Sequence, residues 1–336
     1  MRREAPFRLP VWVKVAVTAA LLAASLALVP FDALAGRLAR ADAGWLAVSA
    51  TLLTLGGFAG AASWFFVIRS GLPGLSYREV AACHWSGMFF NTFLPSNVGG
   101  DVVKGYIITQ RQGRTGFVVM SLLIDRALNL GVLVAFGLFA LLLELDRAGW
   151  AAAFGAALLL LFAAAPALAR RVGKRMDRWP REGLRGKVAG LARPFIGLAG
   201  QPRLFFATLL AALASQALKT WHNVFVVLAF GLKIPALCVW YLIPVLGIVS
   251  ALPVTIGGLG LREMVAQGMS GPLKADNAEL LTLSLAGYLM VVLVNLLGAI
   301  PFFFARRKKT DHEADTPRPV VTEGETVPEQ PSSLNG

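Results

Sequence analysis

Two short segments of the sequence place a cation just beyond residues that break helices. They read LPSNVGGDVVKG, from Leu94 to Gly105, and LPVTIGGLGLRE, from Leu252 to Glu263. Each has Leu-Pro, three residues, Gly-Gly, and a basic residue four positions after the second glycine, which is Lys104 or Arg262. Proline ends a helix because it lacks an N–H and restricts the residue before it. Paired glycines then permit a tight reversal and a close backbone approach.

The chemistry that this arrangement favours is the binding of an anion. A second half-helix is expected to start at about Asp101 in the first copy and at about Gly260 in the second. The first N–H groups of such a helix have no partner within it, and its positive dipole end attracts anions such as phosphate. Lys104 and Arg262 would add charge beside each end. The structural alternative is that proline and glycine merely kink two helices while carbonyls satisfy the basic residues.

Asp125 and Arg126 lie about nine residues into the apolar stretch 116–143. At ~1.5 Å per residue this places them roughly 14 Å deep in a ~30 Å hydrocarbon core, where ionisable residues are costly and usually functional. Because adjacent residues on a helix do not face each other, we expect different partners for the two. The available opposite charges are Lys104, Arg262, Asp101 and Glu263. The alternative is a structural ion pair that fastens the broken helices to the spans.

The two motif copies are not identical. The counterpart of Asp101 is Leu259, and the counterpart of Glu263 is Gly105. Asp101 could cap its half-helix or act on substrate or protons, and the sequence leaves both roles open.

The stretch 204–232 carries a stripe of polar residues, Gln216, Lys219 and Asn223, with His222 beside it. Their spacing of three to four places them on one helix face, which should turn to the protein interior. A structural role for His222 and a polar relay through Lys219 and His222 are both open. Tryptophans 12, 45, 64 and 150 are interpreted as interfacial anchors.

The predicted substrate-binding residues combine both motifs with the intramembrane charges. They are Asn97, Gly99, Gly100, Asp101, Lys104, Asp125, Arg126, Thr255, Gly257, Gly258, Arg262 and Glu263. No metal site and no cofactor is predicted, because Cys83 and Cys238 form no CxxC or Cys/His cluster.

These residues must be positioned by an all-α polytopic membrane fold. Of the 336 residues, 56% are hydrophobic and only 15% are charged, against about 25% in soluble domains. Six apolar segments are predicted to span fully: 11–30, 45–68, 116–143, 149–169, 204–232 and 280–305. The first also resembles a signal peptide, but an uncleaved span is favoured. The net charge of +13 gathers at the termini and around 170–203, which the positive-inside rule explains without nucleic acid.

The charges of the loops orient these spans. The segment 170–193 carries nine basic and two acidic residues, whereas the predicted outer loops carry five basic and six acidic ones. The rule therefore places both termini in the cytoplasm of a multi-pass protein of the cell (inner) membrane. The stretches 80–108 and 234–269 must then each enter and leave on one side, the first cytoplasmic and the second outer. We expect two oppositely oriented re-entrant helical hairpins.

An offset of 158 residues also superposes the span 45–68 on 203–226 and the span 116–143 on 274–301. This predicts an inverted repeat, with units at about 45–143 and 203–305, within a single transmembrane domain of residues 1–305. Residues 306–336 are polar and are expected to form a disordered cytoplasmic tail.

Three segments resemble a known family: FLPSNVGGDVVKGYII, LLIDRALNL and LPVTIGGLGLREMV. They are similar to the flippase-like integral membrane family, which shares the transmembrane region of lysylphosphatidylglycerol synthases. The resemblance covers most of 10–305 and implies a helical fold with re-entrant segments and a lipid or lipid-linked substrate. The matching positions are Pro95, Gly99, Gly100, Asp101, Arg126, Pro253, Gly257, Gly258 and Glu263. The synthase activity belongs to a separate soluble domain, and is not expected here.

The leading hypothesis is a flippase for an anionic phospholipid or a polyprenyl-phosphate-linked lipid, with the headgroup held between the two hairpin tips. Inverted-repeat transporters place broken helices at such a midplane site. The alternatives are an intramembrane lipid-modifying enzyme and a non-transporting partner of such an enzyme. Enzymatic activity is not expected, because no paired-carboxylate, metal or nucleophile motif is evident. The sequence does not indicate the oligomeric state.

Overall fold

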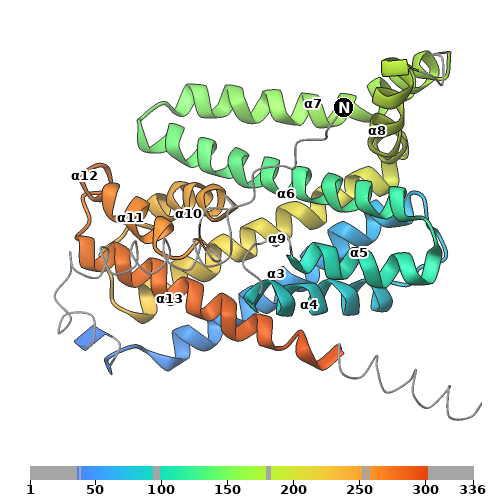
Figure 1. Cartoon of the computed structure of the whole chain (residues 1–336). Coiled ribbons are helices and arrows are strands. Elements are labelled where there is room, and N and C mark those ends of the chain that lie inside the picture. Colours follow the sequence, from blue (N-terminus) through green and yellow to red (C-terminus); the bar gives the residue numbers. More distant parts are fainter. Residues whose placement is uncertain are drawn as a thin grey trace, which may run out of the picture.

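The computed structural model describes residues 36–37, 39–93, 99–178, 183–251, 255 and 258–301, and their regular structure is helical throughout (Figure 1). The helices are α3 (Ala43–Arg69), α4 (Tyr77–Phe93), α5 (Gly99–Gln112), α6 (Thr115–Glu144), α7 (Ala148–Met176), α8 (Gly183–Ala199), α9 (Pro202–Ala229), α10 (Ala236–Ala251), α11 (Leu261–Gly268), α12 (Ser270–Leu273) and α13 (Asn277–Leu296).

Five of the described helices are long and apolar enough to cross a membrane: α3, α6, α7, α9 and the helical stretch from α13 to Pro301. They match five of the six predicted spans. The predicted first span, 11–30, and the predicted tail, 306–336, lie outside the described residues. The chain is a multi-pass membrane protein.

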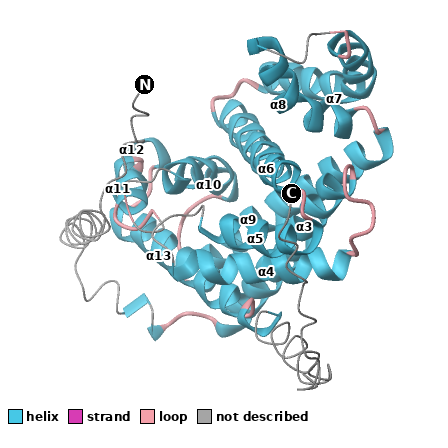
Figure 2. Ribbon diagram, turned by 45° about the vertical axis from the view of Figure 1, so that its right-hand side comes forward, coloured by secondary structure: helices cyan, strands magenta, loops and turns pink. Residues whose placement is uncertain are grey.

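One predicted loop is helical instead. The basic segment between the fourth and fifth predicted spans was expected to leave the helix after residue 169. In the structure α7 continues to Met176, and α8 follows within the same segment. Basic side chains do not oppose helix formation, so the end of the apolar run does not end the helix. Figure 2 shows α7 and α8 together at one side of the molecule.

The antiparallel pair α3 and α9 forms the centre of the bundle. Trp45 stacks on Phe225, and further along, the Ser215 hydroxyl donates to the Gly56 carbonyl at 2.9 Å. Residue numbers rise along α3 as they fall along α9, so the helices run in opposite directions. Gly56 and Gly60 of α3 face Ser215 of α9, and such small residues permit a close approach, as is usual between membrane helices.

The helix pairs α4–α5 and α10–α11 pack at opposite ends of this bundle (Figure 1). The cluster around α4 and α5 includes Val118 at the start of α6. The cluster around α10 and α11 includes Ala140 near the end of α6. These two positions are separated by roughly 33 Å of helix at ~1.5 Å per residue. The pairs therefore lie at opposite ends of α6.

Candidate functional site

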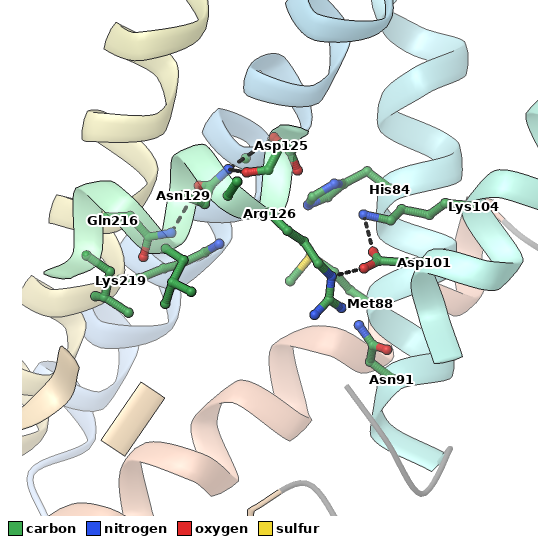
Figure 3. Close-up of a pocket in the computed structure, with 14 residues that line it drawn as sticks. His84, Met88, Asn91, Asp101, Lys104, Asp125, Arg126, Asn129, Gln216 and Lys219 are labelled. Carbon is green, nitrogen blue, oxygen red and sulfur yellow. Dashed lines mark hydrogen bonds and ion pairs between the residues drawn. The ribbon is translucent and has the colours of Figure 1, made fainter. Parts of the chain in front are cut away.

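A cavity of about 390 Å³ opens between α3, α4, α5, α6 and α9 (Figure 3). The described side chains that line it are mostly polar or charged, although it lies among apolar helices. The charged ones are Asp101, Lys104, Asp125, Arg126 and Lys219. Such a group of ionisable residues within membrane helices is a strong indication of a functional site.

Asp101 joins two cations in this cavity. Its carboxylate accepts from the Lys104 ammonium at 2.7 Å, one turn further along α5. It also pairs with the Arg126 guanidinium of α6 (Figure 3). Lys104 is only 6% exposed and lies over the ring of Trp64, 5.0 Å from its centroid. Asp101 therefore links α5 to α6 by ion pairs. Among the described contacts, its side chain does not cap α5.

Asp125 makes different contacts, as its adjacency to Arg126 predicts. Its Oδ1 accepts from the Ser63 hydroxyl at 2.8 Å and from the Asn129 amide at 3.0 Å. Asn129 in turn accepts from the Gln216 amide at 3.0 Å. This chain of hydrogen bonds joins α3, α6 and α9, and Figure 3 shows its part from Asp125 through Asn129 to Gln216. The expectation that Asp125 would pair with one of the nominated cations is wrong, because the nearest donors are neutral groups of α3 and α6.

A second cavity of about 460 Å³ adjoins the first and extends towards α10, α11 and α13. Five residues line both cavities: Met88, Asn91, Arg126, Gln216 and Lys219. The second also includes Ser250, in the last turn of α10, and Arg262, in the first turn of α11. The ends of both helix pairs therefore line two adjoining central cavities, which are called the central space below.

Arg262 is held by three neighbours, Ser284, Glu263 and Tyr288. Its Nε donates to the Ser284 hydroxyl of α13 at 3.0 Å, and it lies 3.4 Å from a carboxylate oxygen of Glu263. Glu263 is fully buried, and it accepts from the Ser284 hydroxyl at 2.8 Å and from the Gly260 N–H at 2.6 Å. The guanidinium also lies over the Tyr288 ring.

The half-helices begin close to where the sequence predicts, but their first N–H groups already have partners. The Gly100 N–H donates to the Asn91 side chain at 2.7 Å, and the Gly260 N–H donates to Glu263. The expectation that these N–H groups would bind an anion is therefore wrong at Gly100 and Gly260. The cationic side chains that line the two cavities are among the groups left to bind an anion.

The glycines have backbone roles in both copies. A Cβ on Gly100 would collide with the Gly87 carbonyl of α4, so this glycine lets α4 and α5 touch. Gly258 has a φ of +81°, a conformation that glycine adopts readily, and it packs against Ser250 of α10.

Five of the twelve predicted substrate-binding residues line the two cavities: Asp101, Lys104, Asp125, Arg126 and Arg262. Gly100, Gly258 and Glu263 are described but line neither cavity. Asn97, Gly257, Pro95 and Pro253 lie outside the described residues. Gly99 begins α5 and Thr255 is buried, but neither is among the residues that line the two cavities. His222, predicted as part of a relay, lines the second cavity. It contacts Ser49 and Asn223, and no relay to Lys219 is seen among the described contacts.

Several cavity residues were not predicted. Asn91, His84 and Asn129 line the first cavity. Ser284 holds Arg262 and Glu263 in place by hydrogen bonds. Polar residues in apolar segments were the available signal for Asn91 and Asn129. Trp64, interpreted as an interfacial anchor, is instead fully buried and donates to Ser121 at 3.2 Å.

Comparisons with known proteins agree with the membrane fold and the lipid-related motifs. No curated protein and no solved structure matches the chain significantly. A family model described as the lysylphosphatidylglycerol synthase TM region matches residues 11–304. This match covers most of the chain, confirms the resemblance seen in the three sequence motifs and indicates a lipid-related function in the membrane. The chain therefore belongs to the lysylphosphatidylglycerol synthase TM region family.

Proposed function

We propose that this protein is a transporter that moves an anionic phospholipid or a polyprenyl-phosphate-linked lipid between leaflets. The observation that carries the proposal is the central space formed by the two adjoining cavities. Its described lining includes four cationic side chains, Lys104, Arg126, Lys219 and Arg262. Preorganised cations in a low-dielectric space favour an anionic headgroup, while the acyl chains remain in the surrounding lipid.

The inverted repeat is part of this proposal, and the helix contacts support it. An offset of 158 residues exchanges α3 with α9, α4 with α10, α5 with α11, and α6 with α13. Under this exchange the contact α4–α5 becomes α10–α11, α5–α6 becomes α11–α13, and α4–α13 becomes α10–α6. All of these pairs are in contact.

The polar contacts follow the same exchange. The offset carries Arg126 onto Ser284 and Lys104 onto Arg262. In the first half, Arg126 of α6 binds Asp101, which lies close to Lys104. In the second half, Ser284 of α13 binds Glu263, which lies next to Arg262. The two acids, Asp101 and Glu263, do not occupy equivalent positions in the repeat. The counterpart of Glu263 is position 105, which lies one helical turn after Asp101. The asymmetry of the motif is thus a shift of the carboxylate along one helix face.

We infer that α4–α5 and α10–α11 are re-entrant hairpins. These helices have 17, 14, 16 and 8 residues, whereas a span needs about 20. Broken helices at membrane depth are tolerated where they line a cavity, as the ends of α4 and α10 do. With the loop charges, this arrangement supports a topology with both termini in the cytoplasm and a location in the cell (inner) membrane.

An inverted repeat gives a physical route for transport. Two related halves can open the central space to one side and then to the other, because each half can adopt the arrangement of its counterpart. The headgroup would meet the Lys104 side from one leaflet and the Arg262 side from the other. Arg126 and Lys219, which line both cavities, would stay in contact with it.

Reconstitution of the purified chain into liposomes tests this function against its alternatives. A transporter moves a fluorescent anionic lipid across the bilayer without altering it chemically. A lipid-modifying enzyme would yield a new product, for example in the presence of magnesium. A partner of such an enzyme would do neither alone. If liposomes that contain the folded protein show no transbilayer movement of the lipid, the proposal is contradicted.

A further inference from the structure

Lys219 differs from the other cations of the central space in its contacts. Lys104 pairs with Asp101 at 2.7 Å, and Arg262 lies 3.4 Å from Glu263. The Lys219 ammonium makes no hydrogen bond, and no ion pair within 4.0 Å, with any side chain in the part of the chain that the structure describes. Its stem packs against α3 beside Gly56.

The place of Lys219 is also distinct, because it lines both cavities. Gln216 lies one turn before it on α9 and lines both cavities too, as does Asn91 at the end of α4. Asp125 attracts the Lys219 ammonium, but from beyond ion-pair distance. A buried ammonium without a direct ion pair is destabilising. A lysine in this position is therefore expected to receive its counter-charge from a ligand.

We propose that Lys219 binds the phosphate of a singly charged lipid headgroup, at the passage that joins the two cavities. This inference rests on the proposed function and adds the group that is bound and its charge. Lys104 and Arg262 would guide the headgroup at either end, since their charges are already offset by carboxylates. Asn91 and Arg126, which also line both cavities, add N–H donors for the phosphate oxygens.

The charge of the preferred headgroup follows from the charges of the site. Among the described residues, the four cations face three carboxylates, Asp101, Asp125 and Glu263. One formal positive charge is left over. A phosphodiester with one negative charge makes the site neutral, whereas a diphosphate leaves it negative in a medium where unbalanced charge is costly. A zwitterionic headgroup leaves the excess charge uncompensated.

Lipid titration of the purified full chain in mild detergent tests the inference, with fluorescent phosphatidylglycerol as the probe. Lys219→Met is expected to weaken binding by about tenfold to a hundredfold, the range for loss of a charge-assisted hydrogen bond. Lys219→Arg should recover most of the affinity. Lys233→Met removes the same charge from an exposed position outside both cavities, so it should leave binding unchanged.

Stability separates a ligand-binding role from a structural one. Removing an unpaired buried charge should leave the midpoint of thermal unfolding of Lys219→Met unchanged or raised. A lowered midpoint together with weakened binding would overturn the assignment and make Lys219 a structural residue.

Further binding measurements distinguish a failure of this inference from a failure of the proposed function. If the wild type prefers phosphatidylglycerol to phosphatidylcholine but Lys219→Met binds as tightly, the inference fails while the function stands. If the wild type shows no such preference, the proposed function fails as well. Diacylglycerol diphosphate should bind more weakly than phosphatidylglycerol, and equal binding would overturn the charge argument. Displacement of the lipid by equimolar glycerol phosphate would assign the site to a soluble anion and overturn the lipid assignment.

Discussion

Replacing Glu263 with glutamine should destabilise the protein strongly, although the two side chains have nearly the same shape. The carboxylate is fully buried, accepts hydrogen bonds from Gly260 and Ser284, and lies 3.4 Å from the Arg262 guanidinium. Neutralising it leaves the arginine without its counter-charge. Breaking a buried ion pair in this way costs about 3 to 5 kcal/mol. In a domain of this size the loss lowers the unfolding midpoint by roughly 5 to 15 °C.

Fluorescence-detected gel filtration after heating in mild detergent would measure that midpoint. Glu79→Gln is a matched control, because Glu79 pairs with Arg111 at 3.6 Å while both side chains are exposed. Its effect should stay below about 1 kcal/mol, since such pairs are screened by solvent. Adding Arg262→Met to Glu263→Gln should recover part of the loss, because it removes the uncompensated charge. Equal midpoints for Glu263→Gln and Glu79→Gln would refute the reasoning.

Two further predictions concern topology and helix packing. Cysteines at Gly74 and Gly271, exposed positions with open space around them, should react with an impermeant maleimide from opposite sides of the membrane; labelling from the same side would contradict the inverted repeat. Gly100→Ala should lower the unfolding midpoint, because a Cβ there collides with the backbone of α4. Gly116→Ala, which meets open space, should not lower it, and equal shifts would argue against tight α4–α5 packing.

The spans could be predicted from the sequence because hydrophobic length is a local property. The predicted span 45–68 corresponds to Ala43–Arg69, and 116–143 corresponds to Thr115–Glu144. The extension of α7 to Met176 could not be read from the same signal. A window of hydrophobicity shows where a helix leaves an apolar medium, and it does not show where the helix itself ends.

The partners within the site were predictable only in part. The adjacency of Asp125 and Arg126 implies diverging contacts, and opposite charge correctly nominates Asp101 for Arg126. Which neutral groups surround Asp125 depends on how α3 and α6 pack, so no sequence pattern points to Ser63. Ser284 illustrates the same limit, because a serine in an apolar span carries little signal until the half-helix beside it is placed.

The unpaired state of Lys219 could not be predicted either. The sequence places it on a polar helix face, but it does not show that Asp101 is already engaged with Lys104 and Arg126. Pairing among the other charges leaves Lys219 as the cation available to a ligand in the described part of the site.

The most direct test of the central claim is the transbilayer movement of phosphatidylglycerol labelled on an acyl chain, in liposomes that contain only this protein. Dithionite added outside destroys the fluorescence of outer-leaflet lipid. We predict that the protein exposes the inner-leaflet pool of labelled phosphatidylglycerol to dithionite, with or without an imposed ion gradient, and leaves phosphatidylcholine protected. Equal protection of both lipids in protein-containing and protein-free liposomes would contradict the account, as would equal loss of both.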